Sequence, residues 1–157
     1  MRRVVFAVAF VLAVLTVSAQ TSNGPALPSY AGRWQASFQG KPFFIVILTQ
    51  SGNGLTGSIK HTRDIHVNNK GVVDKVAPDM AQEQVVDTKL MGDHLRIVGK
   101  NDETQDENVY DLQLVPTIIP KSNKTVYKNG LLRMVRADMP SDIPTIQPWK
   151  VTWVSAK

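Results

Sequence analysis

Residues 32–38 read GRWQASF and residues 149–155 read WKVTWVS, and these two stretches decide the fold. Apolar and polar residues alternate in both of them, with Trp34, Ala36 and Phe38 on one face of the first stretch and Trp149, Val151 and Trp153 on one face of the second. This alternation is the period of a β-strand that buries one face. The two stretches therefore predict a first and a last strand that each turn an aromatic face toward the core.

A last strand with so apolar a face is a hazard at the open edge of a sheet, because unpaired strand edges attract other chains. If the last strand pairs with the first, the sheet closes and both edges disappear. We therefore expect an all-β protein, an antiparallel up-and-down β-barrel of about eight strands. A two-sheet β-sandwich is the alternative, since the number and the spacing of the strands fit both architectures.

Between these two strands, short β-branched and aromatic runs alternate with turn residues, as in an antiparallel sheet. The pattern predicts further strands over 43–50, 55–59, 85–90, 94–100, 109–115 and 131–137. A hairpin turn is expected at 91–93, and one helical turn over 78–82. Pro116 is expected to end its strand and to lead into a polar connection over 121–130. Prolines recur across 139–147, so an extended loop is expected before the last strand.

The start of the chain reads as a signal peptide. Arg2 and Arg3 supply the basic start, residues 4–17 the apolar segment, and Ala19 the small residue at the cleavage site. The apolar segment is shorter than the roughly 20 residues that a membrane-spanning helix needs. We therefore expect a cleaved signal over 1–19 and export of the rest of the chain.

The remaining sequence divides into a flexible leader over 20–29, rich in Ser, Asn, Gly and Pro, and one barrel domain over 30–157. The chain has no cysteine, which excludes disulfides and a lipid-modified cysteine. Small animal extracellular domains usually carry disulfides, so this composition favours a bacterial periplasmic or secreted protein. We expect no stable membrane insertion after the signal is cleaved.

A Gly-x-Trp phrase at Gly32 and Trp34, followed by Gly-Lys-Pro at 40–42 and Leu-Thr-Gly at 55–57, carries a family resemblance. It resembles the opening of lipocalin-like small barrels of the calycin type. Within that group it looks closest to uncharacterised bacterial secreted β-domains. The resemblance covers about residues 31–61.

In this family the tryptophan of strand one lies near the closed end of the barrel, and an arginine of a late strand packs over its ring. The resemblance therefore implies a lipocalin-like barrel in which Arg133 or Arg136 covers Trp34. The chain differs from lipocalins in its lack of cysteine and in the proline-rich stretch that stands where they carry a helix.

The charge of the chain is only mildly basic. The formal net charge of +5 falls to +3 once Arg2 and Arg3 leave with the signal. One region around Tyr127 is basic, and it holds Lys121, Lys124, Lys128, Arg133 and Arg136. A nucleic-acid surface would need a stronger basic stripe with interleaved aromatic residues. We therefore expect no nucleic-acid partner, and consider anionic polymers of the cell envelope the more fitting electrostatic partner.

Two clusters of polar residues are candidate metal sites. His61, Asp64 and His66 lie close in sequence, but residues five positions apart on a strand point to opposite faces, whereas zinc or copper needs converging ligands. Acidic residues crowd 102–107 without the alternating ligands and central glycine of an EF-hand loop. We expect no metal site and no cofactor, and interpret the acidic stretch as a charged hairpin tip.

The sequence has no Gly-x-Ser-x-Gly elbow, no cysteine nucleophile and no phosphate-binding glycine loop. Its paired carboxylates occur only in the acidic stretch, which is expected to be exposed rather than buried as acid catalysis requires. We therefore expect that the protein is not an enzyme. A metal-dependent enzyme is the remote alternative.

Seven side chains are expected to line the interior, either as core or as the wall of a ligand site: Trp34, Phe38, Phe44, Val46, Tyr110, Trp149 and Trp153. A barrel of about eight short strands can be filled by its own side chains. The sequence therefore favours a non-catalytic interaction module of the cell envelope, with a solid barrel and an unknown partner. The alternative is a carrier that holds a small apolar or amphipathic ligand among these side chains.

Overall fold

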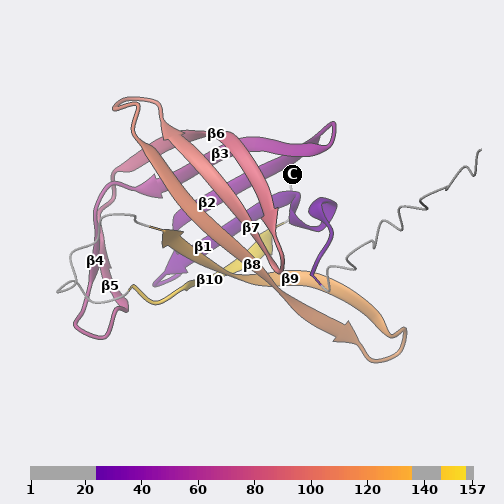
Figure 1. Cartoon of the computed structure of the whole chain (residues 1–157). Helices are drawn as coiled ribbons and strands as arrows, with labels where there is room; N and C mark the ends of the chain where they lie inside the picture. The colour runs from indigo at the N-terminus through magenta and orange to yellow at the C-terminus, as the bar shows by residue number, and fades with distance from the viewer. Residues whose placement is uncertain (1–23, 136–145, 155–157) are drawn as a thin grey trace, which may run out of the picture.

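The computed structural model describes residues 24–135 and 146–154 (Figure 1). Its elements are η1 (Leu27–Tyr30), β1 (Gly32–Phe38), β2 (Lys41–Ser51), β3 (Gly54–Thr62), β4 (Ile65–Val67), β5 (Val73–Val76), β6 (Met80–Met91), β7 (His94–Asn101), β8 (Glu107–Ile119), β9 (Lys124–Val135) and β10 (Trp149–Val154). The expected signal over 1–19 lies outside the described residues, and so does most of the proline-rich stretch. In the described part, no helix is both long enough and apolar enough to cross a membrane.

Eight of the strands form a closed antiparallel barrel in the order β1-β10-β9-β8-β7-β6-β3-β2. The first and the last strand lie side by side, with Trp34 opposite Trp153 and Arg33 opposite Val154. The predicted all-β, antiparallel up-and-down barrel of about eight strands is confirmed, and the sandwich alternative is wrong. A closed barrel of this kind fits a lipocalin-like fold in general.

The 3-10 helix η1 lies at the end of the barrel where β1 begins, which we call the helix end. Tyr30 is buried there, and its backbone oxygen accepts a hydrogen bond from the Trp34 indole nitrogen at 2.8 Å. The Tyr30 hydroxyl donates to the backbone oxygen of Asp93 in the β6–β7 turn at 3.2 Å. The sequence predicts a flexible leader over 20–29. In the structure, the part of this segment from Leu27 onward is a helical turn, and Leu27 packs against the core.

Strands β4 and β5 form a separate two-stranded sheet, the arm, which is inserted between β3 and β6. At its base, Thr62 Oγ1 donates to the backbone oxygen of Ala77 at 2.5 Å. At its tip, the backbone N–H of Gln147 donates to the backbone oxygen of Gly71 at 2.9 Å. The arm lies where β1 ends and β10 begins, so we call this the arm end, and Figure 1 shows it opposite η1.

Strand β6 begins earlier than the sequence pattern predicted. It starts at Met80, which pairs with Thr62 of β3, so the helical turn predicted over 78–82 is wrong. Along its first residues, exposed and buried positions alternate, with Ala81 and Glu83 buried. Pairing with β3 along this period-two pattern decides the conformation, because β-structure depends more on neighbouring strands than on local preference.

Strands β8 and β9 also exceed their predicted limits. β8 continues through Pro116, and β9 begins at Lys124, inside the polar connection that was predicted over 121–130. β7 pairs with β8 only as far as Gln113, and a bulge separates Val115 from Pro116. Proline is tolerated at bulges and at free strand edges, and Pro116 occupies both, so it does not end the strand as predicted.

Candidate functional site

Four of the seven predicted lining residues lie deep in a filled interior. Trp34, Phe44 and Tyr110 are 0% exposed and Val46 is 1% exposed. The side chains around them are 0% exposed as well, and include Ile59, Leu95, Ile97, Leu112 and Leu132. A void large enough for water would expose the side chains that surround it. These four residues therefore belong to the hydrophobic core.

The other three predicted residues lie at the two ends of the barrel. Trp149 is 7% exposed and Phe38 is half-buried, and both lie at the arm end. Trp153 is half-buried at the helix end, where its indole lies against Gly32. The predicted set is therefore divided between the core and both ends, rather than gathered around one cavity.

A groove of about 270 Å³ lies between the arm and the rim of the barrel. This rim groove is lined by Ala36, Ser37, Phe38, Phe43, Gly71, Val72, Val73, Gln147, Pro148, Trp149 and Lys150. The hydrogen bond from Gln147 to Gly71 ties the arm to the chain that leads into β10, so two walls of the groove are held together. Mostly apolar walls with a few polar groups are the usual lining of a small-molecule site.

A second hollow, of about 310 Å³, shares Phe38 with the rim groove. Its other lining residues are Gln39, Lys41, Asp74, Lys75 and Val76. Together with Lys150 of the groove, three lysines and one aspartate line the two spaces, and Asp74 is already paired with His66. The polar border of the groove is therefore positively charged.

Trp149 connects the rim groove to the core through ring contacts. Its ring centroid lies 5.4 Å from that of Phe43, edge-on, and 5.1 Å from that of Phe44. Phe44 in turn stacks on His61 at 5.8 Å. The Trp149 indole nitrogen is buried and has no hydrogen-bond partner among the described residues. Packing against the two phenylalanines therefore holds this ring in place.

A buried carboxylate that the sequence analysis did not single out lies inside the barrel near the arm end. Glu83 of β6 is 0% exposed. It accepts hydrogen bonds from the Tyr110 hydroxyl at 3.1 Å and from Asn108 Nδ2 at 2.6 Å, and His61 Nε2 lies 3.1 Å from its Oε1. A side chain on Gly99 would overlap the Glu83 carboxylate, so glycine leaves room for it. The carboxylate is thus surrounded by protein donors, as a buried charge requires.

The imidazole of His61 is placed to form an ion pair with the Glu83 carboxylate. Its Nδ1 faces the backbone oxygen of Thr62 at 2.8 Å, while its Nε2 faces Glu83. A neutral imidazole donates from one nitrogen only, so the protonated ring alone satisfies both acceptors. Burial by itself lowers the pKa of His61, but the hydrogen bonds to Glu83 and Thr62 outweigh it and raise this pKa above its usual 6.5.

The structure separates the candidate metal ligands His61, Asp64 and His66. His61 faces Glu83 inside the barrel, whereas His66 lies on the arm and pairs with Asp74. Asp64 contributes its backbone oxygen to the base of the arm. Within residues 24–135 and 146–154, no three His, Cys, Asp or Glu side chains gather so that they could hold a metal ion.

The acidic stretch forms the turn between β7 and β8. The side-chain oxygen of Asn101 accepts hydrogen bonds from the backbone N–H groups of Glu103 and Thr104, which fixes the turn. Arg63 pairs with Glu103, so this turn also contacts the residue that follows β3. The stretch is a charged hairpin tip, as predicted.

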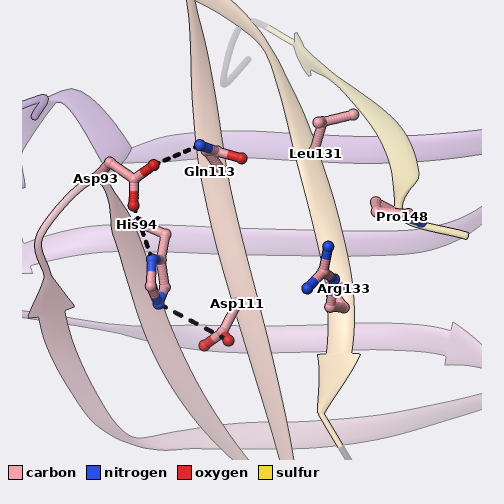
Figure 2. Close-up of a pocket in the computed structure, with 7 residues that line it drawn as sticks. All are labelled: Asp93, His94, Asp111, Gln113, Leu131, Arg133 and Pro148. Atoms are coloured by element: carbon pink, nitrogen blue, oxygen red, sulfur yellow. Dashed lines mark hydrogen bonds and ion pairs between the residues drawn. The ribbon is translucent and has the colours of Figure 1, made fainter.

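A smaller hollow of about 130 Å³ lies on the outer wall of the barrel (Figure 2). Asp93 accepts a hydrogen bond from Gln113 Nε2 at 2.6 Å and pairs with His94 Nδ1 at 3.0 Å. The hydrogen bond with His94 holds the pKa of Asp93 below its usual value. Asp111 lies 3.8 Å from His94 Nε2 and binds Arg96 through two hydrogen bonds. These side chains form a solvent-facing network of hydrogen bonds and ion pairs.

Arg133 belongs to this outer wall, so its expected place over the ring of Trp34 is wrong. It is exposed, lines the hollow and stands opposite Asp111 across the β8–β9 ladder, whereas Trp34 points into the barrel (Figure 2). Residue Arg136, the other candidate, lies outside the described residues. The indole of Trp34 is bound instead by Tyr30 of η1.

A scan against protein-family models found no match to this chain, and searches of the curated proteins and of the solved structures found no significant similarity.

Proposed function

We propose that this protein is an exported, non-catalytic binding module with a lipocalin-like barrel, and that its binding site is the rim groove rather than the barrel interior. The contrast between these two spaces supports the proposal. Trp34, Phe44 and Tyr110 fill the interior, whereas the groove of about 270 Å³ offers accessible apolar surface beside Phe38 and Trp149. A partner can therefore bind at the rim without any rearrangement of the core.

The chemistry of the groove favours an amphipathic molecule with an anionic end. Its apolar part would pack on Phe38, Val73 and Trp149. Its anionic group would reach Lys150 in the groove or Lys75 beyond Phe38, and opposite charges at the border of an apolar site fix the orientation of a ligand. If the protein is a carrier, this ligand is a free small molecule. If it is an interaction module, the ligand is part of a larger component of the envelope.

The way the ionisable groups are used supports a non-catalytic role. Glu83 and Tyr110 are 0% exposed and bonded to each other, so a substrate has no path to them in this conformation. The acid and base side chains of the outer wall, Asp93, His94 and Asp111, are engaged in their own network. Among the described residues that line the groove, Lys150 is the one with a charged side chain and Ser37 the one with a hydroxyl, and no acid or histidine accompanies them.

Calorimetric titration of the chain from Gln20 with decanoate, decanol and lysophosphatidylglycerol tests this function. We expect decanoate to bind more tightly than decanol, because only decanoate pairs with lysine. Val72→Asp should abolish binding, since it places a negative charge in the groove wall. Val86→Asp is the matched control, because Val86 is equally exposed and lies outside the groove.

Lys150→Gln should weaken the binding of decanoate but not that of decanol, and Lys60→Gln on the barrel wall should change neither. Binding of decanoate would favour a carrier of free small molecules. Binding of the lysophospholipid alone would favour an interaction module that recognises an envelope lipid. The proposal is wrong if none of the three molecules binds saturably, or if Val72→Asp and Val86→Asp bind as the parent protein does.

A further inference from the structure

The tip of the β8–β9 hairpin leaves the barrel as a two-stranded ribbon, residues 115–128. β7 pairs with β8 only up to Gln113, and β10 pairs with β9 only from Asn129 onward. Within the ribbon the two strands therefore pair only with each other, as far as Ile119 opposite Lys124. Figure 1 shows the ribbon extending from the helix end, away from the arm.

The ribbon exposes apolar side chains on both of its faces. Ile118 is 65% exposed, and Ile119 and Val115 are each 40% exposed. Neighbouring residues of a strand point to opposite faces, so Ile118 and Ile119 lie on different sides of the ribbon. A ribbon that docks flat on a folded protein partner needs only one apolar face. A ribbon tip that is apolar on both faces is better suited to insertion into an apolar phase that surrounds it.

The ribbon is also basic without any counter-charge of its own. Lys121, Lys124 and Lys128 are exposed, and residues 115–128 include no Asp or Glu. On the outer wall of the barrel, by contrast, the basic side chain of Arg96 is paired with Asp111. Lysines beside exposed isoleucines are the pattern of segments that bind the surface of anionic membranes.

The free edges of the ribbon are poorly suited to pairing with a strand of another protein. Pro116 of β8 and Pro120 of the turn lack backbone N–H groups, and Lys124 and Lys128 lie on β9. Proline and lysine are the residues with which proteins protect strand edges against strand addition. A partner would therefore recognise the side chains and the charge of the ribbon rather than its backbone.

We propose that the ribbon docks the protein reversibly on an anionic lipid surface. The isoleucines enter the boundary between headgroups and acyl chains, and the lysines bind the lipid phosphates. This contact is peripheral and leaves the barrel in water. It uses the end of the barrel opposite the rim groove, so it is independent of the function proposed for the groove.

Sedimentation with lipid vesicles tests the proposal. The chain from Gln20 is used, because residues 4–17 would bind lipid themselves and every described strand lies after them. We expect binding to vesicles that contain about a third phosphatidylglycerol, and little binding to pure phosphatidylcholine. Replacing the three lysines of the ribbon by glutamine should weaken binding about a hundredfold, since each lysine near an anionic surface contributes about fivefold.

Ile118→Thr with Ile119→Thr should also weaken binding, by about tenfold, because less apolar surface reaches the acyl chains. Lys60→Gln with Lys89→Gln, two exposed lysines of the barrel wall, and Val72→Asp in the rim groove are controls that should bind as the parent does. All of these sites are exposed, and an unchanged melting temperature would establish that each variant folds.

Equal binding to both kinds of vesicle, binding to neither, or an unchanged affinity of the ribbon variants would overturn the proposal. A ribbon variant that instead abolishes self-association, seen by size-exclusion chromatography, would identify the ribbon as a protein contact and would also overturn it. If Val72→Asp fails to bind decanoate but binds vesicles normally, the result supports the binding site in the groove and leaves the proposal for the ribbon unaffected.

Discussion

The indole nitrogen of Trp153 lies where a side chain on Gly32 would begin. Gly32 has a φ of +128°, in a region that residues with a side chain rarely adopt. The two residues belong to β1 and β10, the strands that pair to close the barrel. The glycine of the Gly-x-Trp phrase is therefore required by barrel closure, because the indole of the last strand needs its space.

Gly32→Ala should lower the free energy of unfolding by about 2 to 4 kcal/mol, because the new methyl group meets the Trp153 ring and the backbone stays in an unfavourable region. Urea unfolding followed by tryptophan fluorescence measures this loss. Gly54→Ala is the control and should change little, since the nearest atom to a side chain there is the Ser51 oxygen at 4.0 Å. An unfolding midpoint that stays at the parent value in Gly32→Ala would mean that the contact is not tight.

The pair of His61 and Glu83 should make stability depend on pH. The pKa of His61 is raised in the folded protein above the usual 6.5, so its contribution is fully present below pH 6.5 and is lost as pH rises through the raised value. We expect the free energy of unfolding of the parent, compared with that of His61→Gln, to fall as pH rises from about 6.5. Urea unfolding between pH 5 and 9 measures the difference, and two parallel pH profiles would contradict it.

Gly99→Ala should destabilise the protein by about 1 to 3 kcal/mol, because a methyl group there overlaps the Glu83 carboxylate. Glu83→Ser should also destabilise it, since the donors of Tyr110 and Asn108 lose their acceptor. Combining the two should cost less than the sum of the single losses, because the shorter side chain frees the space. Thermal unfolding of the four proteins forms a double-mutant cycle, and strict additivity would argue against the overlap.

Trp34→Phe should destabilise the helix end by about 1 to 3 kcal/mol, because the buried backbone oxygen of Tyr30 loses its donor. Hydrogen exchange would show where the loss occurs. We expect faster exchange in η1 than at the arm end, and uniform acceleration throughout the barrel would show that the bond does not fix η1 specifically.

The closure of the barrel could be predicted from the sequence because it depends on patterns that are local and clean. Apolar and polar residues alternate over 34–38 and 149–153, and the need to cover two apolar strand edges pairs the two segments. The limits of β6 and β8 could not be predicted in this way. Met80 and Pro116 stand in strands because partner strands lie beside them, which local preference does not record.

The candidate site was predictable only in part, and for a related reason. Phe38 and Trp149 were singled out as lining residues, but the arm that completes the rim groove lies in a segment whose alternation is weak. Glu83 was missed because β6 was expected to start after it. Once β6 is extended to Met80, the alternation that buries Ala81 also turns Glu83 inward, and this signal could have found it.

The ribbon and the rim groove stand at opposite ends of the barrel and share no residue. Substitutions at sites that are far apart and without common partners add in free energy. Each end can therefore change its affinity without any compensating change at the other, while the filled core between them keeps the strands in register. The barrel thus separates its two ends energetically, and substitutions at each end can accumulate independently in evolution.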